Sequence, residues 1–542
     1  MGYGSVFNGA AIIPNLDALK REGVSADMYS YRFCSPTRAS FLTGRYPWRV
    51  SSTICDSRVC NYLPATVPMG VHLGYSMLPQ RLQEKGYVSY HVGKWHEVRR
   101  HAPRTRAHPH SPQRHPHTHT HTPTLAPSSS QGLYAPHFTP LHRGFNRSNG
   151  FLSGGEDHYT LAGDLGTGRG CDPSRGMTRD AFIENKTAPQ VVGQYTGTRF
   201  MDAAVDYIRG HDSAAPLFLY LALHNTHGPI EAEPADVALY NATFPWGLQS
   251  RYYAMTTAVD RTVGAVVAEL TRRGLWDNTL LIWTCDNGAP VGVAGSNGGL
   301  RGGKGSNWEG GVRERAIFAG GLVPPARRGA TLPRALGAFH VADAHATFLA
   351  RAGLSPADPN PRAPAPVDGM DVWDWVLGAV PRSPRTEAGM PLDHLNYDAA
   401  SGLTGAYIRG DLKLLTGAPP RKGNPWAGSE VAQAAWYGGP PLYFSPNASM
   451  PAPPMNQTAC WNTVAPFACL FNLTADPGEH TDIAAAHPDL LAAMMADFVA
   501  LNASYHPPYT VPGDERALLC AVALENDNVA APWRTAPLPQ DM

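Results

Sequence analysis

The chain has 542 residues, a length that suggests two to four domains. Lys plus Arg number 44 and Asp plus Glu also number 44, so the formal net charge is zero and no global basic field exists to bind nucleic acid or an anionic membrane. Charged residues make up 16% of the chain against about 25% in ordinary soluble domains, and hydrophobic residues make up 43%, which is enough for a core. We therefore expect a globular protein that does not bind polyanions through overall charge.

Predicted helices and strands alternate over the first two thirds of the chain. IPNLDALKREGV predicts a short helix that starts at Pro14 and ends at Gly23. SPTRASFLTGRY predicts a helix from Pro36 to Thr43 with Gly44 as its C-cap, and MLPQRLQEKG predicts an amphipathic helix before the strand YVSYHV. The apolar runs PLFLYLAL (216–223) and TLLIWTC (279–285) flank a long helical pattern. Continuous apolar strands between helices predict an α/β domain over residues 1–375, with a mostly parallel sheet sandwiched by helices.

The remainder of the chain, residues 376–542, has a different character. The linker-like stretch PADPNPRAPAP precedes it. AYIRGDLKLLTG (406–417) and ACLFNLTADPGEH predict strands of an antiparallel sheet, and HPDLLAAMMADFVALNA predicts one amphipathic helix. We expect a smaller C-terminal α+β domain.

A tract rich in His and Pro, residues 98–131, fits neither domain. It holds seven of the 22 His and six Pro, and it has almost no apolar periodicity. Such a segment cannot bury a core, so we predict a disordered low-complexity insert, with a retained intron or a lineage insertion as the preferred origin. A metal-binding His tract is the alternative. Transcript reads across Trp95 to Leu133 that uniformly contain the insert would exclude the intron.

The sequence contains signs of a secretory protein, although its first residues do not match a signal peptide. No run of 18 or more apolar residues occurs, so we expect no membrane span. Eight Cys without a C-x-x-C pair favour scattered disulfides over zinc. Seven N-x-S/T acceptors occur where roughly two or three are expected by chance, which favours passage through a secretory compartment; they are Asn146, Asn185, Asn241, Asn447, Asn456, Asn472 and Asn502.

Polar clusters follow three of the predicted strands. YVSYHV runs into Lys94 and His96, PLFLYLAL into His227, and TLLIWTC into Asp286 and Asn287. Ligands of open α/β sheets bind beyond the carboxyl ends of the strands. Carboxylate and amide oxygens suit Ca²⁺ or Mg²⁺, whereas Lys and His donors suit an anionic tetrahedral group. Each cluster alone is also typical of an ordinary surface turn, but three together favour one shared site.

A fourth cluster, C-S-P-T-R at Cys34 to Arg38, precedes ASFLTGRYPWRV and forms a C-x-P-x-R motif at a predicted helix N-terminus. This motif resembles the signature of the sulfatase family, in which the pentapeptide directs oxidation of its Cys to formylglycine. Thr37 stands where Ser is usual. Because Thr keeps the hydroxyl, we expect the conversion to survive.

The resemblance extends over almost all of the chain outside the His-rich insert, including GKWH, LALHNTHGPI, CDNGAPVGVAGSNGGLRGGKGSNWEGGVR and LFNLTADPGEH. It implies an alkaline phosphatase-like fold, in which the C-terminal α+β domain contains an antiparallel sheet. WEGGVR, LKLLTG and the E-D-H-Y segment are most similar to the arylsulfatase B branch, which removes the 4-sulfate of N-acetylgalactosamine.

By resemblance, the chain is a sulfuric ester hydrolase that acts on a sulfated glycan or an aryl sulfate and meets a formylglycine-generating enzyme during maturation. Arg38 and Lys94 would hold the formylglycine, His96 would act as the base that eliminates sulfate, and His227 with Lys304 would bind sulfate and protonate the leaving oxygen. The implied catalytic set is Cys34, Arg38, Lys94, His96, His227 and Lys304, and the implied ligands of one Ca²⁺ are residue 34, Asp286 and Asn287.

One part of the family pattern is missing. The family's metal site also uses an adjacent Asp pair just before a segment similar to Met1–Gly4, and this sequence contains no D-D dipeptide. An N-terminal truncation is the favoured interpretation, because it also explains the absent first strand and signal peptide; the expected location is then secreted or lysosome-like. A degenerate, non-catalytic sulfoglycan-binding protein is one alternative, and a formylglycine-dependent phosphonate or phosphate ester hydrolase is another.

Disulfide pairing follows from the resemblance only loosely. Cys55 would pair with Cys520, and Cys460 with Cys469. Cys60 has no obvious partner, and Cys285 is assigned to packing.

Overall fold

The computed structural model describes residues 10–50, 71–95, 135–163, 179–244, 247–290, 294–396, 403–416 and 468–501, and, near the C-terminus, residues 520, 522, 524–526 and 532. The predicted insert at 98–131 lies outside these ranges, as does His96.

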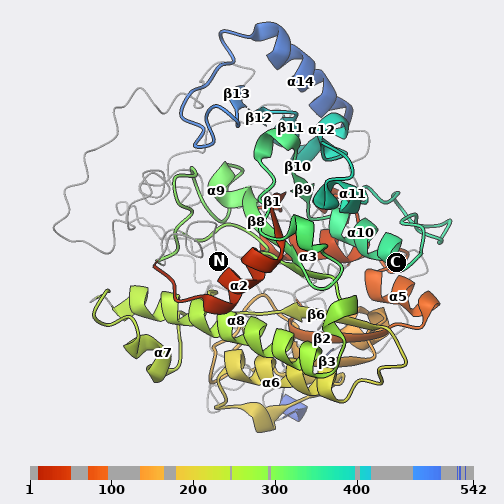
Figure 1. Ribbon diagram of the computed structural model, residues 1–542, viewed down its shortest axis with the longest axis vertical. Helices are drawn as coiled ribbons and strands as arrows, with labels where there is room; N and C mark the ends of the chain where they lie inside the picture. Colours follow the sequence, from red (N-terminus) through yellow and green to blue (C-terminus); the bar gives the residue numbers. More distant parts are fainter. Residues whose placement is uncertain are drawn as a thin grey trace, which may run out of the picture.

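Two mixed sheets form the body of the larger part of the chain (Figure 1). One has the strand order β7-β8-β1-β9, and in it β1 pairs antiparallel with β8 and parallel with β9. The other has the order β5-β4-β3-β2-β6, and in it β2 is parallel to both β3 and β6. The strands are β1 (Val24–Tyr29), β2 (Val88–Lys94), β3 (Arg147–Phe151), β4 (Phe182–Ile183), β5 (Lys186–Thr187), β6 (Leu217–Ala222), β7 (Leu281–Trp283), β8 (Arg313–Ala319) and β9 (Phe339–His340).

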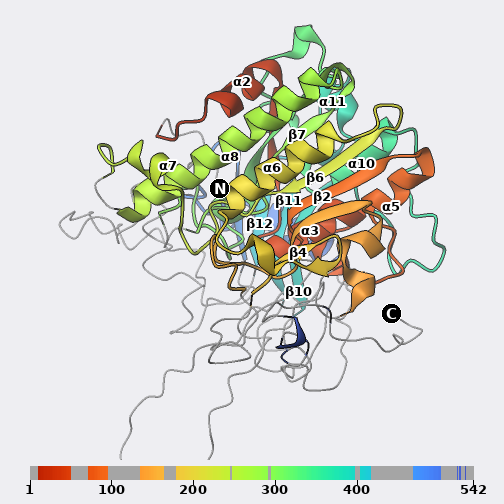
Figure 2. The same cartoon turned by 90° about the horizontal axis from the view of Figure 1, so that it is seen from below.

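Helices cover both faces of these sheets (Figure 2). On one face, α6 and α8 pack against β2, β3 and β6, while α2 and α8 pack against β7 and β8. On the other face, α3, α5, α10 and α11 fill the core. Their bounds are α2 (Pro14–Glu22), α3 (Cys34–Thr43), α5 (Leu78–Leu82), α6 (Thr196–Arg209), α8 (Gly247–Arg272), α10 (Asp343–Arg351) and α11 (Trp373–Leu377); shorter helices are α4 (Pro47–Val50), α7 (Pro234–Ala238), α9 (Glu309–Val312) and α12 (Arg385–Ala388).

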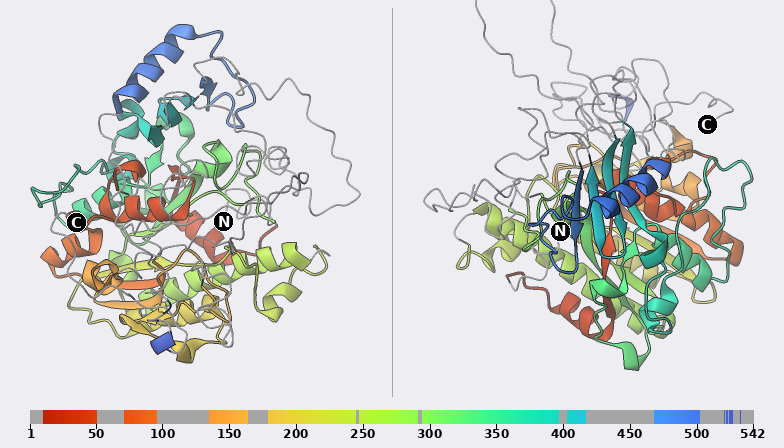
Figure 3. Two further views of the ribbon diagram at one scale, coloured as in Figure 1. Left: turned by 180° about the vertical axis from the view of Figure 1, so that it is seen from behind. Right: turned by 90° about the horizontal axis from the view of Figure 1, so that it is seen from above.

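A separate antiparallel sheet lies in the C-terminal part and has the order β10-β11-β12-β13. Helix α14 (Pro488–Ala500) lies across this sheet (Figure 3), and its side chains Met494 and Phe498 are buried against it. The strands are β10 (Met390–Asn396), β11 (Leu403–Arg409), β12 (Leu412–Thr416) and β13 (Ala468–Asn472).

The predicted fold class is confirmed, with a larger antiparallel share than expected. Among the described strands of the larger part, β1–β9, β2–β3 and β2–β6 are parallel and the other pairs are antiparallel. Residues 406–416, from a segment predicted to lie in the antiparallel sheet, belong to a hairpin of β11 and β12 that turns at Gly410, whose φ of +59° suits glycine. The division at residue 375 stays a prediction.

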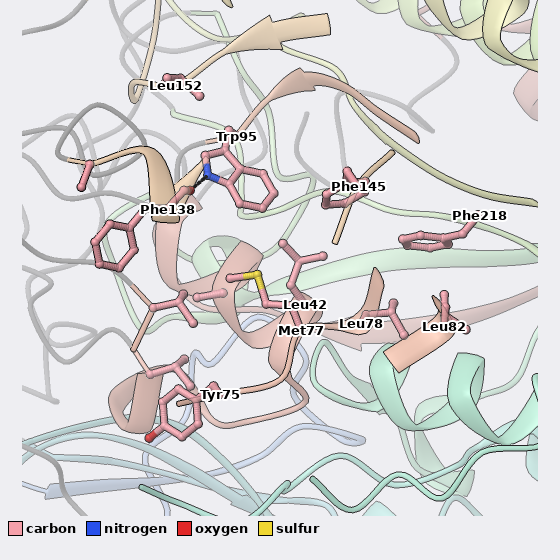
Figure 4. Packing of buried hydrophobic residues seen from close by; sticks show 14 of the residues in the cluster. Leu42, Tyr75, Met77, Leu78, Leu82, Trp95, Phe138, Phe145, Leu152 and Phe218 are labelled. Carbon is pink, nitrogen blue, oxygen red and sulfur yellow. Dashed lines mark hydrogen bonds between the residues drawn. The ribbon is translucent and has the colours of Figure 1, made fainter. Parts of the chain in front are cut away.

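The apolar core next to α3 fixes the end of strand β2 (Figure 4). Trp95 follows β2 directly and is fully buried, and its indole Nε1 donates a hydrogen bond of 2.8 Å to the carbonyl of Phe138. Leu42 of α3 and Phe218 of β6 belong to the same cluster. The last residue of β2, Lys94, is thereby held beside α3 and beside the start of the chain segment after β6.

A buried ion network joins the C-terminal sheet to the larger part. The ammonium of Lys413 on β12 lies 2.9 Å from Oε1 of Glu309 and 2.8 Å from Oε1 of Glu479, and all three side chains are fully buried. Tyr29 donates a hydrogen bond to Glu309, and the main-chain N–H of Glu309 donates one to Glu479. One ammonium thus links two carboxylates from separate parts of the chain.

Replacing Lys413 by Met should destabilise the protein by about 3–5 kcal/mol, because Glu479 then loses the cation that it contacts and faces Glu309, which keeps only Arg313 at 3.4 Å. Urea unfolding measures the change. Arg409→Ala on the neighbouring strand is the control, since Arg409 and Asp497 form a partly exposed ion pair worth about 0–1 kcal/mol. Equal effects of the two substitutions would contradict the role of the network.

Candidate active site

Cys34 occupies the first residue of α3, where two side chains converge on its sulfur. Nζ of Lys304 donates to Sγ over 3.2 Å, and Sγ lies 3.3 Å from Oδ1 of Asn287. Cys34 is only 5% exposed. The helix begins two residues before the predicted start at Pro36 and ends as predicted at Gly44, which has a φ of +70°. The sulfur therefore lies at the helix N-terminus, where main-chain N–H groups favour an anion.

Two further cations surround Cys34. Arg38, one turn along α3, donates 2.6 Å to Oδ2 of Asp286 and 3.1 Å to the carbonyl of Lys94. Lys94 is 2% exposed at the end of β2. Asp286 lies just after β7, so the contact joins the carboxyl ends of strands from both sheets.

The charged groups of this cluster shift one another's pKa values. Burial and Asp286 raise the pKa of the Cys34 thiol, but Lys304, Lys94 and Arg38 outweigh both, so the pKa lies below its ordinary value. Burial raises the pKa of Asp286, but Arg38, Lys94 and Lys304 hold it well below its usual range. Burial lowers the pKa of Lys94 to about 8. Anions are favoured at position 34, and Asp286 stays a carboxylate.

His227 lies in the segment that follows β6. Its Nδ1 is 2.9 Å from the carbonyl of Gly228, which can only accept, so Nδ1 carries the proton and Nε2 is the free acceptor of the neutral ring. Burial lowers the pKa of His227 well below its ordinary value, and Lys304 and Lys94 lower it further. The ring is therefore neutral and shares its surroundings with the cations of the cluster.

The loop that carries Lys304 is held by side-chain and main-chain hydrogen bonds. The buried amide of Asn297 donates to the carbonyls of Ala289 and Gly302 and accepts from the N–H of Ala289. The N–H of Lys304 itself donates to Ala289. A Gly-rich sequence is required here because a Cβ on Gly288 would lie 1.8 Å from the carbonyl oxygen of Gly310.

The structure thus brings together the predicted residues that it describes: Cys34, Arg38, Lys94, His227, Asp286, Asn287 and Lys304. Sequence reasoning did not find Asn297 or Tyr220, whose hydroxyl lies 3.5 Å from Arg38. An Asn within a Gly-rich loop was the available signal for the first. The hydroxyl of Thr37 is hydrogen-bonded to the main chain of Tyr31 and Phe33, so the fold uses the hydroxyl that Thr shares with Ser.

The oxygen donors near residue 34 suit a divalent cation but do not fill its coordination shell. Asp286 offers a carboxylate and Asn287 an amide oxygen, and Sγ of Cys34 occupies the place of the oxygen that formylglycine would present. Ca²⁺ takes six to eight oxygen ligands. The described residues contain no cluster of three or more His, Cys, Asp or Glu side chains arranged for a metal.

Three cations, one neutral imidazole and one carboxylate around a nucleophile at a helix N-terminus define a site for esters of a tetrahedral oxyanion. The sulfatase family model matches residues 3–353, and the chain belongs to the sulfatase family. It is accordingly a hydrolase of sulfuric esters, and the two alternatives left open by the sequence are not favoured.

Known proteins are similar to this chain over nearly its whole length. Arylsulfatase J of Mus musculus is 27% identical over 521 residues, covering 93% of this chain and 74% of the relative. N-acetylgalactosamine-6-sulfatase of Canis lupus familiaris is 27% identical over 528 residues, covering 95% and 84%. The crystal structure of Ps i-CgsB in complex with k-i-k-neocarrahexaose superposes with a TM-score of 0.66 at 22% identity, covering 97% of this chain and 96% of that one, and so shows the same fold.

Proposed function

We propose that the protein removes sulfate from a sulfated glycan through a formylglycine formed at Cys34. The observation that carries the proposal is the convergence of Lys304 and Asn287 on Sγ, within a cluster that favours an anion. The relatives support a sugar substrate, since one is named N-acetylgalactosamine-6-sulfatase. The arylsulfatase B-like motifs of the sequence support an amino sugar of the same kind, with the sulfated position left to experiment.

The positions of the side chains support the following roles. Hydrated formylglycine at position 34 would supply one hydroxyl as the nucleophile and a second whose deprotonation would expel sulfate, so water would not have to attack sulfur. Lys304 and Arg38 offset negative charge at residue 34 and on the sulfate. Bound sulfate would also offset the lysine charges that lower the pKa of His227, so that its Nε2 could take the proton that the attacking hydroxyl releases and pass it to the leaving oxygen. His96 is the proposed base for elimination.

We propose one Ca²⁺ as the cofactor, held by residue 34, Asp286 and Asn287 and by further oxygens of water and substrate. The ion would polarise the sulfate oxygens when bound. Asp286 supports this assignment because its pKa is held well below the usual range, so it is ionised at any working pH. Coordination would require Asp286 to share its charge between the ion and Arg38.

Hydrolysis of 4-nitrophenyl sulfate tests the proposal. The full chain, coexpressed with a formylglycine-generating enzyme, should release 4-nitrophenol from the sulfate far faster than from 4-nitrophenyl phosphate or a phosphonate monoester. The same protein made without that enzyme should retain Cys34 by mass spectrometry and should be inactive. Turnover of the phosphate ester alone, or equal activity of the two preparations, would refute the proposal.

We also propose that the protein is a secretory or lysosomal glycoprotein with disulfides. Among the described residues, no helix is both long enough and apolar enough to cross a bilayer. The sequon residues Asn146 and Asn241 are exposed and accessible to a glycan. The proposed pairs Cys55–Cys520 and Cys460–Cys469 are supported by the disulfide-bonded state of Cys520 and Cys469.

A further inference from the structure

The segment that carries His227 has a strained backbone. Thr226 has a φ of +73°, a left-handed conformation that a β-branched residue rarely adopts and that costs about 1–3 kcal/mol. The N–H of His227 donates back to the carbonyl of His224 over 3.1 Å, which closes a tight turn. Such a conformation persists only where neighbouring groups fix it, so the position of the His227 ring depends on what binds this turn.

His158 binds the turn directly. Its ring Nε2 lies 3.3 Å from the carbonyl of His227, and its Nδ1 lies 2.7 Å from Oγ1 of Thr196 at the start of α6. Because a carbonyl can only accept, Nε2 is the protonated nitrogen of the neutral ring and Nδ1 accepts from the Thr196 hydroxyl. The N–H of His158 also donates 3.0 Å to Glu231, just beyond the turn.

Ring packing also holds His158 against the turn that carries His227. The ring of His158 is stacked on that of His224 with centroids 4.4 Å apart, and the ring of His224 lies 5.3 Å from that of His227. A Cβ on Gly155 would lie 3.0 Å from Cε1 of His227, so the segment before His158 leaves just enough room for the ring. Within the described residues, neither ring nitrogen of His224 has a hydrogen-bond partner, so this ring contributes packing only.

We propose that His158 is the positioning residue of His227: through its Nε2–H bond to the main-chain carbonyl it sets the place of the imidazole that meets the sulfate ester. The inference rests on the proposed role of His227. His158 is fully buried, and burial lowers its pKa to about 4, so its donor remains on Nε2 at neutral pH. His158, the histidine of the E-D-H-Y segment, would thereby help to position a catalytic group.

Two amide substitutions separate the two nitrogens of His158. In His158→Gln the amide nitrogen can reach the place of Nε2 and keep the bond to His227, whereas in His158→Asn it reaches only the place of Nδ1. We expect His158→Gln to retain kcat on 4-nitrophenyl sulfate within a few-fold. We expect His158→Asn to lose about 100-fold in kcat, as a misplaced catalytic group does, with a smaller change in KM.

His211→Asn is the matched control. His211 is also buried, with Nδ1 3.0 Å from the hydroxyl of Tyr90 and Nε2 2.9 Å from the carbonyl of Ala215, so the same substitution breaks the same kinds of bond away from the site. It should lower the melting temperature and leave kcat unchanged. Formylglycine content, measured by mass spectrometry, normalises every rate.

The outcomes distinguish this inference from the proposed function. If His227→Ala retains full activity, the role proposed for His227 is wrong. If His227→Ala is inactive and His158→Asn keeps wild-type kcat, or if His158→Gln and His158→Asn lose kcat equally, the positioning role of His158 is overturned. A loss in His158→Asn that His158→Gln restores supports it.

Discussion

Replacing Cys34 by alanine should abolish turnover of 4-nitrophenyl sulfate, with a loss of at least roughly 10⁴-fold, since no other group occupies the place of the nucleophile. Lys304 and Asn287 both point at Sγ, and the surrounding charges favour an anion there. Alanine removes the atom on which these contacts converge while leaving the helix α3 intact. Initial rates of the normalised wild type and variant measure the effect.

Serine at the same position gives a sharper test than alanine. A serine offers one hydroxyl and no second hydroxyl to expel sulfate, so Cys34→Ser should release at most about one equivalent of 4-nitrophenol per site and then stop. Continued turnover would contradict the chemistry proposed for residue 34.

Cys285→Ala is the matched control for both variants. Cys285 is likewise a free and buried cysteine, and burial raises the pKa of its thiol, which keeps it protonated. We expect this variant to retain activity within a few-fold, because its side chain belongs to the packing between α2, β7 and β8.

Stability should fall as the pH drops below about 6.5. Burial lowers the pKa of five fully buried histidines, so each takes up a proton on unfolding between its unfolded value near 6.5 and its lower folded value; they are His91, His158, His224, His340 and His345. Their contribution is fully present above pH 6.5 and is lost as the pH falls towards the folded values.

Several buried carboxyls oppose this trend. Burial raises the pKa of Glu314 to about 8 and of Glu479 to about 7, and raises that of Glu156 well above its ordinary value. These groups stabilise the folded state at low pH and lose that effect as the pH rises through their folded values. The histidines take up protons on unfolding between pH 6.5 and 4.5, whereas the carboxyls release protons. We expect the histidines to dominate, so the free energy of unfolding should fall as the pH drops through this range.

Urea unfolding at pH 7, 6 and 5 measures this slope. His345→Asn should reduce it by about one proton, because the ring of His345 is buried against the C-terminal end of α3, where its Nδ1 lies 3.0 Å from the carbonyl of Leu42, and accepts no proton in the folded state at these values. A midpoint that does not change between pH 7 and 5 would contradict the prediction.

The strand ends explain why much of the site could be predicted. Lys94, His227 and Asp286 each follow an apolar run, and the carboxyl ends of β2, β6 and β7 meet beside α3. The antiparallel pairing of β8 could not be predicted, because the strand begins with the charged residues Arg313–Arg315 and so does not show a continuous apolar run.

The contacts that support the site could not be predicted from the sequence. His158 acts through a main-chain carbonyl 69 positions away, and Lys413 pairs with Glu309 at a separation of 104 positions. Neither pattern has a local spacing that indicates it. The bonds exist only because the tertiary fold brings these segments together.

The network around Glu479 also bears on how this enzyme can be divided or recombined. The carbonyl of Glu479 accepts a hydrogen bond from Arg301, and its carboxylate accepts one from the N–H of Glu309, so a C-terminal residue holds both ends of the loop that presents Lys304. The segment after β13 therefore supports the loop that presents Lys304. A domain exchange between sulfatases would have to transfer this loop and its C-terminal support as a single unit.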